Sequence, residues 1–332
     1  MITNKGFEKI DTPRKAVRVA IPASTANLGP GFDTLGMALG LYSWIEMKEA
    51  AQTSITLLGD QLYGIPTDKT NLIYKMAQAV FRKANVSIPE LEITMYSDIP
   101  LTRGLGSSAS ALIGALAAAN ALTGHVLPDE ELLHMATAFE KHPDNVGASL
   151  YGGIVVATWD GQHANCVRIT PPTELQALVI IPDFQLSTTK AREVLPTQLS
   201  MADAIYNISR SSLLVAALYS GKLHLIREAM QDRLHQPYRA TLVPGMEQIL
   251  EQATNHGALG IALSGAGPTM IAFVDRHSAQ KEQLAHYLMD TMKAQGITAS
   301  TLWLEPVTEG VIYYYDTETY SFMDIVKGEV RL

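Results

Sequence analysis

The segment 101–110 carries the residue types that most directly predict chemistry in this chain. It reads Leu-Thr-Arg-Gly-Leu-Gly-Ser-Ser-Ala-Ser and runs into residues 109–122, which are apolar, rich in alanine and typical of a helix. Gly104 and Gly106 can take positive φ and let the backbone approach a ligand closely. Free amides at the helix start, the helix dipole and the two serine hydroxyls would then face an anion. The segment predicts a phosphate-binding loop and, with it, a nucleotide enzyme.

Two common phosphate motifs do not account for this loop. The residues from Gly104 to Ala109 fit the dinucleotide pattern G-x-G-x-x-A, but that pattern needs an acidic residue about 20 residues on, at the end of a second strand. Residues 123–140 predict a turn and a helix instead. A Walker A loop needs a lysine after its last glycine, and none follows here. The loop is an anion site of a third kind, or else a plain tight turn before a helix.

Two further polar segments lie apart from this loop. One contains Asn27, Gly29, Gly31 and Asp33, and as a turn between two strands it would need no other role. The other is Ser-Gly-Ala-Gly-Pro-Thr at 264–269, for which a hairpin turn is the alternative. Two glycines and a proline exceed what a hairpin needs, and a backbone that approaches a ligand would explain them.

A fourth polar segment, His142-Pro-Asp-Asn145, follows a predicted helix that ends at Glu140. Pro143 stops a helix, so a capping turn is the structural alternative. In the functional interpretation, Asp144 and Asn145 lie at the mouth of a loop. Glu140 would then be able to reach a metal ion bound to phosphates.

Composition limits the class of protein. The 332 residues carry a formal net charge of −8 and are 47% hydrophobic, which is typical of a globular chain with a real core. Nucleic acid needs a basic face, so it is not an expected partner. No run of about 18 apolar residues predicts a membrane span, and residues 1–13 contain no apolar signal segment. The single cysteine, Cys166, fits a reducing compartment and predicts a buried, inert thiol. We expect a cytoplasmic protein without membrane or nucleic-acid contacts.

Hydrophobic periodicity predicts a mixed first half. The predicted strands are 17–21, 39–47, 54–58, 91–99 and 152–159, and the predicted helices are 71–84, 109–122 and 128–140. The helix at 71–84 is amphipathic, with Leu72, Met76, Val80 and Ala84 on its predicted buried face. Residues 22–33 are rich in turn formers and are expected to form a loop.

The second half alternates strands and helices. Strands are predicted at 177–181, 259–263, 269–274 and 300–304, and helices at 200–220, 222–234, 244–256 and 277–294. Breaks at Asp160-Gly161 and Pro171-Pro172 predict a boundary that divides the chain into domains 1–168 and 169–332. Paired strands with helices on one side predict an α+β sandwich.

The segments 22–33, 100–110, 142–145 and 264–269, in this order, resemble the motifs of the small-molecule kinases that include galactokinase, homoserine kinase, mevalonate kinase and phosphomevalonate kinase. The resemblance spans residues 17–274 and is strongest to the homoserine kinases. It implies an ATP-binding domain like the second domain of ribosomal protein S5, then a ferredoxin-like domain, with ATP and substrate in the cleft between them. The implied enzyme is a homodimer that transfers the γ-phosphoryl group of ATP to the hydroxyl of L-homoserine, in threonine synthesis.

The resemblance also implies which residues bind the nucleotide. Asn71 would contact adenine, and Ser107 or Ser108 would hold Mg²⁺ together with Glu140. The loop that would wrap the ATP phosphates consists of Pro100, Leu101, Thr102, Arg103, Gly104, Leu105, Gly106, Ser107, Ser108, Ala109 and Ser110.

The substrate pocket follows from the same resemblance. Arg192 and Arg239 would pair with the homoserine carboxylate, because the guanidinium fork matches a carboxylate in a bidentate way. Little proton removal precedes the loose transition state of phosphoryl transfer, so we expect Asp144 to orient the amino group rather than to act as a base. The implied substrate-binding residues are Asn27, Asp33, Asp144, Thr188, Arg192, Arg239 and Gly267, and the implied catalytic residues are Asp144, Asn145, Ser107 and Glu140.

One residue departs from the family pattern. Lys141 stands where these kinases often have glycine after the metal-binding acid, and its side chain could alter the loop or touch the nucleotide. Three other functions stay open. They are a sister kinase acting on a mevalonate-type or sugar hydroxyl, a non-catalytic nucleotide or amino-acid sensor, and, more remotely, a dehydrogenase that binds NAD.

Overall fold

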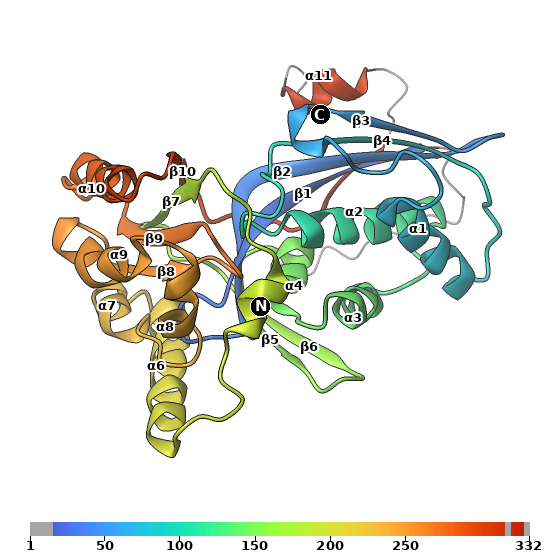
Figure 1. Ribbon diagram of the computed structural model, residues 1–332. Coiled ribbons are helices and arrows are strands. Elements are labelled where there is room, and N and C mark those ends of the chain that lie inside the picture. The colour runs from blue at the N-terminus through green and yellow to red at the C-terminus, as the bar shows by residue number, and fades with distance from the viewer. Residues whose placement is uncertain (1–15, 316–319, 329–332) are drawn as a thin grey trace.

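The computed structural model describes residues 16–315 and 320–328, which form two sheets with helices packed on them (Figure 1). The predicted absence of a signal segment at 1–13 falls outside the described residues. The architecture is α+β with two domains, as predicted. Among the described residues, no helix has the length and apolar character that a membrane span requires.

The first sheet is built around two long antiparallel strands. Its order is β11-β1-β2-β4-β3, with β5 paired to β2 and β6 paired to β5. Of the strand pairs within the described residues, only β3 and β4 run parallel. The strands are β1 (Ala16–Ala26), β2 (Leu35–Glu49), β3 (Ser54–Leu58), β4 (Leu91–Ser97), β5 (Ile154–Trp159), β6 (Ala164–Ile169) and β11 (Ile312–Tyr314). The first part of β2 pairs with β5 and its last part with β4, so β2 links two regions of the sheet.

Helices cover one face of this sheet. They are α1 (Leu72–Lys83), α2 (Ser107–Leu122), α3 (Asp129–Glu140) and α4 (Asp144–Tyr151) (Figure 1). Alternate residues of β1, such as Val17, Val19 and Ile21, point into a core that all four helices share. Because α2 packs against α1, α4 and the sheet together, it is buried almost all round. The opposite face of the sheet carries α11 (Phe322–Val326), which packs against Trp44.

The second sheet has the order β10-β7-β9-β8 and is fully antiparallel. Its strands are β7 (Leu175–Pro182), β8 (Gly260–Leu263), β9 (Met270–Asp275) and β10 (Ala299–Leu304). Leu178 and Ile180 of β7 face α9 (Met246–Gln252) and α10 (Lys281–Ala294). Val179 and Ile181 point the other way, into a core that includes α6 (Met201–Ser220), α7 (Ile226–Ala229) and β2 of the first sheet. This shared core joins the two domains.

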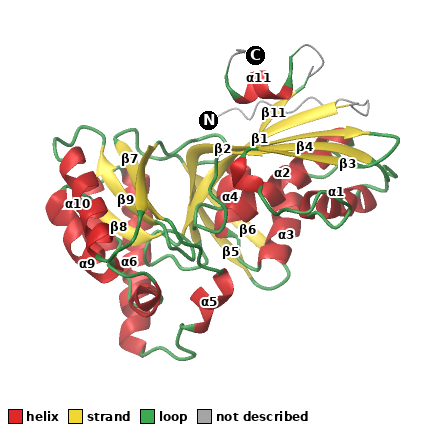
Figure 2. Ribbon diagram, turned by 45° about the horizontal axis from the view of Figure 1, so that its top comes forward, coloured by secondary structure: helices red, strands yellow, loops and turns green. Residues whose placement is uncertain are grey.

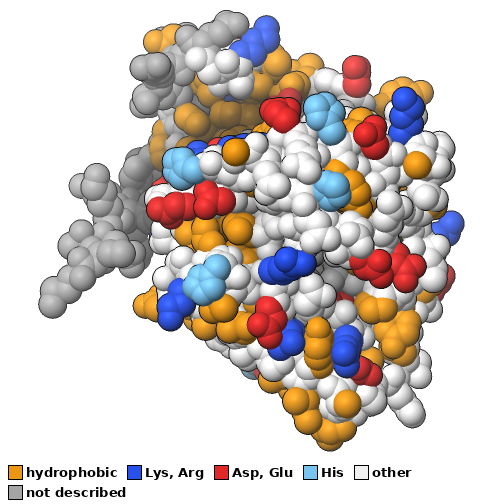
Figure 3. Space-filling model, turned by 90° about the vertical axis from the view of Figure 1, so that its left-hand side faces the viewer, with side chains coloured by type: hydrophobic (Ala, Val, Ile, Leu, Met, Phe, Trp, Pro, Cys, Tyr) orange, Lys and Arg blue, Asp and Glu red, His pale blue; other side chains and the backbone are white. Residues whose placement is uncertain are grey.

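The face of the second domain shown in Figure 3 carries acidic and basic side chains interspersed, with hydrophobic side chains gathered towards its lower end. On α6, Met201, Ile205 and Ile208 are exposed at helical spacing. Two shorter helices, α5 (Thr188–Glu193) and α8 (Gln236–Arg239), lie at the junction of the domains and turn out to line the site described below.

Several predicted elements need correction. Residues 22–26 continue β1 through a bulge at Pro22 and Ala23 instead of forming a loop. The buried face of α1 consists of Ile73, Ala77, Val80 and Phe81, so only one of the four predicted residues is on it. The predicted helix 222–234 ends at Ala229. The helix α4 and the strands β6 and β11 were not predicted.

The predicted division at 168 and 169 stays a prediction. Sheet pairing follows it as far as β10, but β11 pairs with β1 and returns the chain to the first sheet. Figure 2 shows this return, with β11 beside β1 and α11 above them.

Candidate active site

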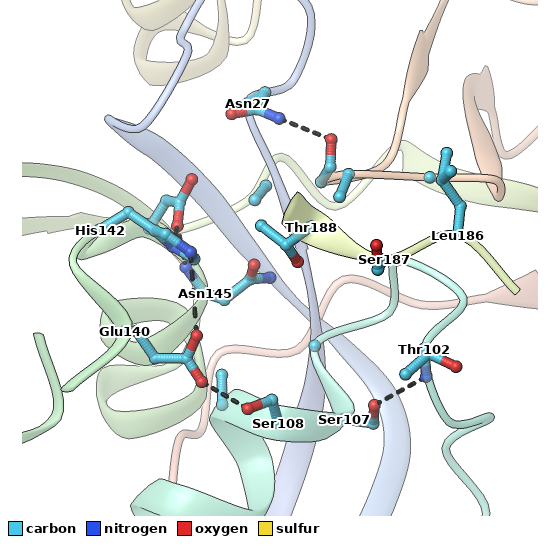
Figure 4. Close-up of a pocket in the computed structure, with 18 of the residues that line it drawn as sticks. Asn27, Thr102, Ser107, Ser108, Glu140, His142, Asn145, Leu186, Ser187 and Thr188 are labelled. Atoms are coloured by element: carbon cyan, nitrogen blue, oxygen red, sulfur yellow. Dashed lines mark hydrogen bonds and ion pairs between the residues drawn. The ribbon is translucent and has the colours of Figure 1, made fainter. Parts of the chain in front are cut away.

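A cavity of about 320 Å³ lies where the two domains meet. Figure 4 shows polar side chains from both domains around it, including Ser108 and Glu140 on one side and Thr188 on another. Most of the predicted site residues line it, namely Asn27, Asp33, Thr102, Gly104, Gly106, Ser107, Ser108, Ala109, Glu140, Asp144, Asn145, Thr188, Arg192, Arg239 and Gly267. The sequence therefore predicted a real cluster, although its members lie as far apart in the chain as Asn27 and Gly267.

The predicted phosphate loop has the conformation that its glycines suggested. Gly106 takes φ +72° and directly precedes α2, which begins at Ser107. Gly104 takes φ +85°, and a methyl group there would collide with the backbone oxygen of Ser264. Glycine is needed here because the loop of the first domain touches the 264–269 loop of the second. The start of α2 thus presents its amides and its positive dipole end to the cavity.

Five predicted loop residues, Pro100, Leu101, Arg103, Leu105 and Ser110, do not line the cavity, and their predicted contacts with ATP stay predictions. Pro100 and Leu101 precede the cavity wall, and Leu105 is fully buried in the core. Arg103 donates to Asp183 Oδ1 at 2.9 Å and to the Pro182 carbonyl at 3.0 Å, which ties the loop to the end of β7.

Ser110 anchors the start of α2 to the sheet. It is fully buried, and its hydroxyl lies 3.3 Å from that of Ser43, which in turn lies 2.7 Å from that of Ser97. Buried hydroxyls that satisfy one another hold a helix end more firmly than apolar contacts alone, because they fix direction as well as distance. We assign Ser110 a positioning role within the loop.

Two oxygen-bearing side chains face each other at the edge of the cavity. The Ser108 hydroxyl donates to Glu140 Oε1 at 2.5 Å, whereas the Ser107 hydroxyl accepts from the Thr102 amide at 3.4 Å (Figure 4). Ser108 rather than Ser107 is thus the serine that shares a potential metal site with Glu140. Lys141 takes φ +72° at the end of α3. That left-handed conformation suits glycine, which gives a physical reason why a glycine is common at this position.

His142 joins two acidic residues of the site, and the sequence analysis assigned it no role. Its Nδ1 lies 2.9 Å from Asp144 Oδ1, and its Nε2 lies 3.8 Å from Glu140 Oε2. Burial lowers the pKa of His142, but the hydrogen bond to Asp144 and the charges of Asp144, Glu140 and Asp33 outweigh it, so the pKa is raised overall. The sequence signal that could have indicated this role is the position of His142 between two acidic residues, Glu140 and Asp144.

Asn145 is held from the first domain's β1. Its Nδ2 donates to the hydroxyl of Ser24 at 3.0 Å and to the backbone oxygen of Ser24 at 3.2 Å. Its backbone amide donates to Asp144 Oδ1 at 2.8 Å. Asp144 is buried, and that carboxylate oxygen is already occupied by His142 and by this amide. The arrangement fixes both side chains at the start of α4, where they line the cavity.

The predicted carboxylate-binding end contains an ion pair between the domains. Arg192 on α5 binds Asp33 in a bidentate way, with Nη2 to Oδ1 at 2.7 Å and Nη1 to Oδ2 at 3.0 Å. Arg239 at the end of α8 is 2% exposed, and its guanidinium lies 5.1 Å from the centre of the Phe32 ring. The guanidinium of Arg192 lies 5.4 Å from the same ring. Phe32 therefore supports both arginines by cation–π contact.

Comparison with known proteins fits this site. The model of the GHMP kinases N terminal domain matches residues 71–153, and that of the GHMP kinases C terminal matches residues 214–288. A homoserine kinase of Desulfitobacterium hafniense is 45% identical over 294 residues, which is 89% of this chain and 98% of that protein. One of Deinococcus radiodurans is 44% identical over 293 residues, 88% and 95% of the two chains. The crystal structure of a homoserine kinase from Cytophaga hutchinsonii has a TM-score of 0.82 at 26% identity, covering 94% of this chain and 100% of that one.

This chain belongs to the homoserine kinase family. Its two-domain α+β fold is that of the GHMP kinases.

Asn71 is a sixth predicted site residue that does not line this cavity. Asn71 is 1% exposed and caps α1, where its Oδ1 accepts from the Ile73 amide at 2.8 Å and its Nδ2 donates to the Pro66 carbonyl at 2.6 Å. Both ends of its amide are thus used within its own loop. Its predicted contact with adenine stays a prediction.

Cys166 lies away from the cavity, on β6. The side chain packs against the helical core, and burial raises the pKa of its thiol to about 12. Because the thiolate is the nucleophilic form of cysteine, the raised pKa favours the inert role that we predicted, although the side chain is half-buried rather than buried.

Proposed function

We propose that this protein transfers the γ-phosphoryl group of ATP to the hydroxyl of L-homoserine and yields O-phospho-L-homoserine for threonine synthesis. One observation carries the proposal. The glycine-rich start of α2 and the Ser108–Glu140 pair form one part of the lining of a single cavity, and two arginines with two acidic residues form another. That division matches a reaction between an anionic nucleotide and a small zwitterion.

The nucleotide end fits ATP with a divalent cation. Mg²⁺ prefers oxygen ligands and often takes only one or two from the protein, the rest coming from phosphates and water. The Ser108 hydroxyl and the Glu140 carboxylate, 2.5 Å apart, are a donor set of that kind. When bound there, the ion would neutralise charge on the phosphates. The free amides at the start of α2 and the positive end of its dipole would hold the β- and γ-phosphates, because both favour an anion.

The acceptor end fits an amino acid. Arg192 and Arg239 offer guanidinium groups to a carboxylate, and Asp33 and Asp144 offer carboxylates to an ammonium group. Because Arg192 and Asp33 are paired with each other, a zwitterion can replace both partners at once without leaving either charge unpaired. Mevalonate and sugars have no ammonium group and would leave the acidic residues unmatched.

The protein contributes to the reaction chiefly by positioning. Phosphoryl transfer has a loose transition state, so in-line placement and charge neutralisation matter more than proton removal. Asp144 is already hydrogen-bonded to His142 and to the Asn145 amide, which suits an orienting role better than that of a base. The predicted cytoplasmic location and homodimeric state stay predictions.

The test is to incubate the protein with Mg·ATP and one acceptor at a time, and to follow ADP release and the mass of the acceptor. L-homoserine, mevalonate and galactose form the panel, with L-threonine as a hydroxylated amino acid of similar charge. We expect the mass of one phosphate to be added to homoserine, and turnover on homoserine to exceed that on the others by at least about a hundredfold. Preferred turnover on mevalonate or galactose, or ATP binding without any turnover, would refute the proposal.

A further inference from the structure

A buried polar cluster lies directly behind the substrate end of the cavity and contains groups that the proposed mechanism does not use. It contains Asp232, His235 and Arg239, around the short helix α8. The side chains of Asp232 and His235 are 0% exposed, and Arg239 is 2% exposed. Burying three ionisable groups destabilises the fold unless each of them is fully hydrogen-bonded. The hydrogen-bond partners of each group therefore indicate its role.

Asp232 organises the start of α8. Its Oδ2 accepts from the amides of His235 at 3.0 Å and Gln236 at 2.7 Å, and its Oδ1 accepts from the amide of Leu234 at 2.9 Å. Asn207 on α6 adds a side-chain donor to Oδ1 at 2.7 Å. Four donors satisfy the carboxylate, and they fix the backbone that carries His235 and, one turn later, Arg239.

The protonation state of His235 follows from its neighbours. Its Nε2 lies 2.8 Å from the carbonyl oxygen of Gly29, and a carbonyl can only accept, so Nε2 carries the proton. Its Nδ1 lies 3.4 Å from Nη1 of Arg239, a group that can only donate, so Nδ1 is the acceptor. The ring is thus neutral. Burial lowers the pKa of His235, and the charge of Arg239 acts in the same direction, against that of Asp232.

Arg239 is held on three sides. Its Nε donates to the Ala191 carbonyl at 2.9 Å, and its Nη1 donates to the Gly265 carbonyl at 3.0 Å and faces His235. The guanidinium also lies over the Phe32 ring. That ring is stacked on the His235 ring, with 5.1 Å between the two ring centres. Among the described residues, Nη2 has no hydrogen-bond partner, although Arg239 lines the cavity.

We propose that Asp232 and His235 are positioning residues for substrate recognition. They lock Arg239 in the orientation that leaves its Nη2 edge for the substrate carboxylate. Arg239 is the residue that touches the substrate, and the other two act only through it. This inference rests on the proposed function for the identity of the ligand, but the locked geometry does not depend on which acid is bound.

The expected effect is confined to the acceptor. Replacing His235 by Ala removes the acceptor for Nη1 and the ring that stacks on Phe32. The KM for L-homoserine should therefore rise about tenfold or more, as for the loss of a hydrogen bond to a charged group. The KM for ATP should change less than about twofold, because the phosphate loop lies in the other domain. His235→Gln offers an amide that can restore the bond to Gly29, and it should recover part of the loss. His224→Ala, at an exposed histidine of the same domain, is the matched control.

A double-mutant cycle separates positioning from general damage. If His235 acts through Arg239, then His235→Ala should raise the KM for homoserine no more than about twofold in an Arg239→Ala background. Equal effects in both backgrounds, or a wild-type KM in a folded His235→Ala variant, would overturn the inference.

A measurement on the unmodified protein covers the case in which these variants do not fold. Long-range ¹H–¹⁵N spectra of the histidine rings should show for His235 a protonated Nε2 and an unprotonated Nδ1 at pH 7. A proton on Nδ1 would exclude the bond from Arg239 and so defeat the inference, whatever the substrate is. Failure of the wild-type protein to phosphorylate homoserine would instead refute the proposed function. The assigned protonation of the His235 ring would still be tested by the spectrum alone.

Discussion

The close approach of the two domains at Gly104 makes a sharp prediction for the substitution Gly104→Ala. The added methyl group would lie less than 3.0 Å from the Ser264 carbonyl oxygen and 3.2 Å from that of Gly267, whereas ordinary contacts begin at 3.4 Å. Both obstacles are backbone atoms, which cannot rotate away as a side chain can. The phosphate loop or the 264–269 loop must therefore move by something on the order of 1 Å, and alanine must also adopt φ near +85°.

The size of the effect follows from the chemistry of phosphoryl transfer. A misplacement of about 1 Å between reacting groups costs roughly a hundredfold in rate, or about 2.7 kcal/mol of transition-state stabilisation. The left-handed conformation alone costs alanine only about 1–2 kcal/mol of folding stability. We therefore expect kcat/KM for ATP to fall roughly a hundredfold in a variant that is still folded at 25 °C.

Gly161→Ala is the matched control for this prediction. Gly161 takes φ +95° at the turn between β5 and β6, and no atom lies within 4 Å of the position that its methyl group would occupy. The two variants thus share the backbone strain and differ in the collision. The assay is steady-state ADP release with L-homoserine at saturation, accompanied by thermal unfolding of both variants. If Gly104→Ala lost no more activity than Gly161→Ala, the explanation of this glycine by domain contact would be wrong.

Three further outcomes follow from named contacts. Ser108→Ala should raise the Mg²⁺ concentration needed for half-maximal turnover by about tenfold, and Ser107→Ala should raise it much less, because only Ser108 faces Glu140; a magnesium titration of both variants decides this. Asp144→Asn should raise the KM for homoserine about tenfold and leave measurable kcat, whereas normal homoserine binding with no turnover would favour a base. Because the folded pKa of His235 is lowered, its neutral form stabilises the fold above pH 6.5 and this contribution is lost as the pH falls through the folded pKa. Urea unfolding at pH 7.0 and 5.5 should show wild type losing up to about 1.4 kcal/mol per pH unit more than His235→Gln, and equal losses in the two proteins would contradict the assigned state of the ring.

Local sequence signals predicted the phosphate loop and the helix after it because their causes are themselves local. Gly106 is where the backbone must become left-handed before α2, and Gly124 follows the end of that helix. The run between them is apolar on all sides, so its prediction did not require an exposed face to be assigned. The helix at 71–84 shows the limit of the same reasoning. Its buried face is shifted by one residue from the predicted one because α2 packs on it from one side.

The predictions of some other elements were wrong because contacts with distant residues override local propensity. Pro22 and the small residues after it are typical of a turn, yet they continue β1 because β2 pairs along their whole length and absorbs the irregularity in a bulge. The apolar pattern of 222–234 is typical of a helix, yet Asp232 takes the amides of the following residues and starts a new helix there. Neither partner can be identified from a sequence window.

The site was predictable as a set of segments but not as a set of contacts. The resemblance brought Asn27, Arg192 and Arg239 into one pocket, and the structure places them there. It could not show that Arg192 pairs with Asp33, 159 residues away, or that Ser108 rather than Ser107 meets Glu140. His142 was missed because a histidine beside proline is also a common way to end a helix, and only its distances to two carboxylates distinguish the roles.

The contacts across the domain junction explain why so many glycines belong to the site. Asn27 donates to the Gly265 carbonyl at 2.9 Å, His235 donates to the Gly29 carbonyl at 2.8 Å, and Gly104 lies against the Ser264 backbone. In each case one domain contacts the main chain of the other. At Gly104 both partners are main-chain atoms, so a rotamer change cannot relieve that contact. Transfer between two bound substrates requires the nucleotide and acceptor ends of the cavity to keep a fixed separation. The nucleotide end lies in the first domain, whereas the acceptor end takes residues from both domains. The fixed separation therefore depends on the junction, and backbone-to-backbone approach at glycine is the closest contact that a polypeptide can make.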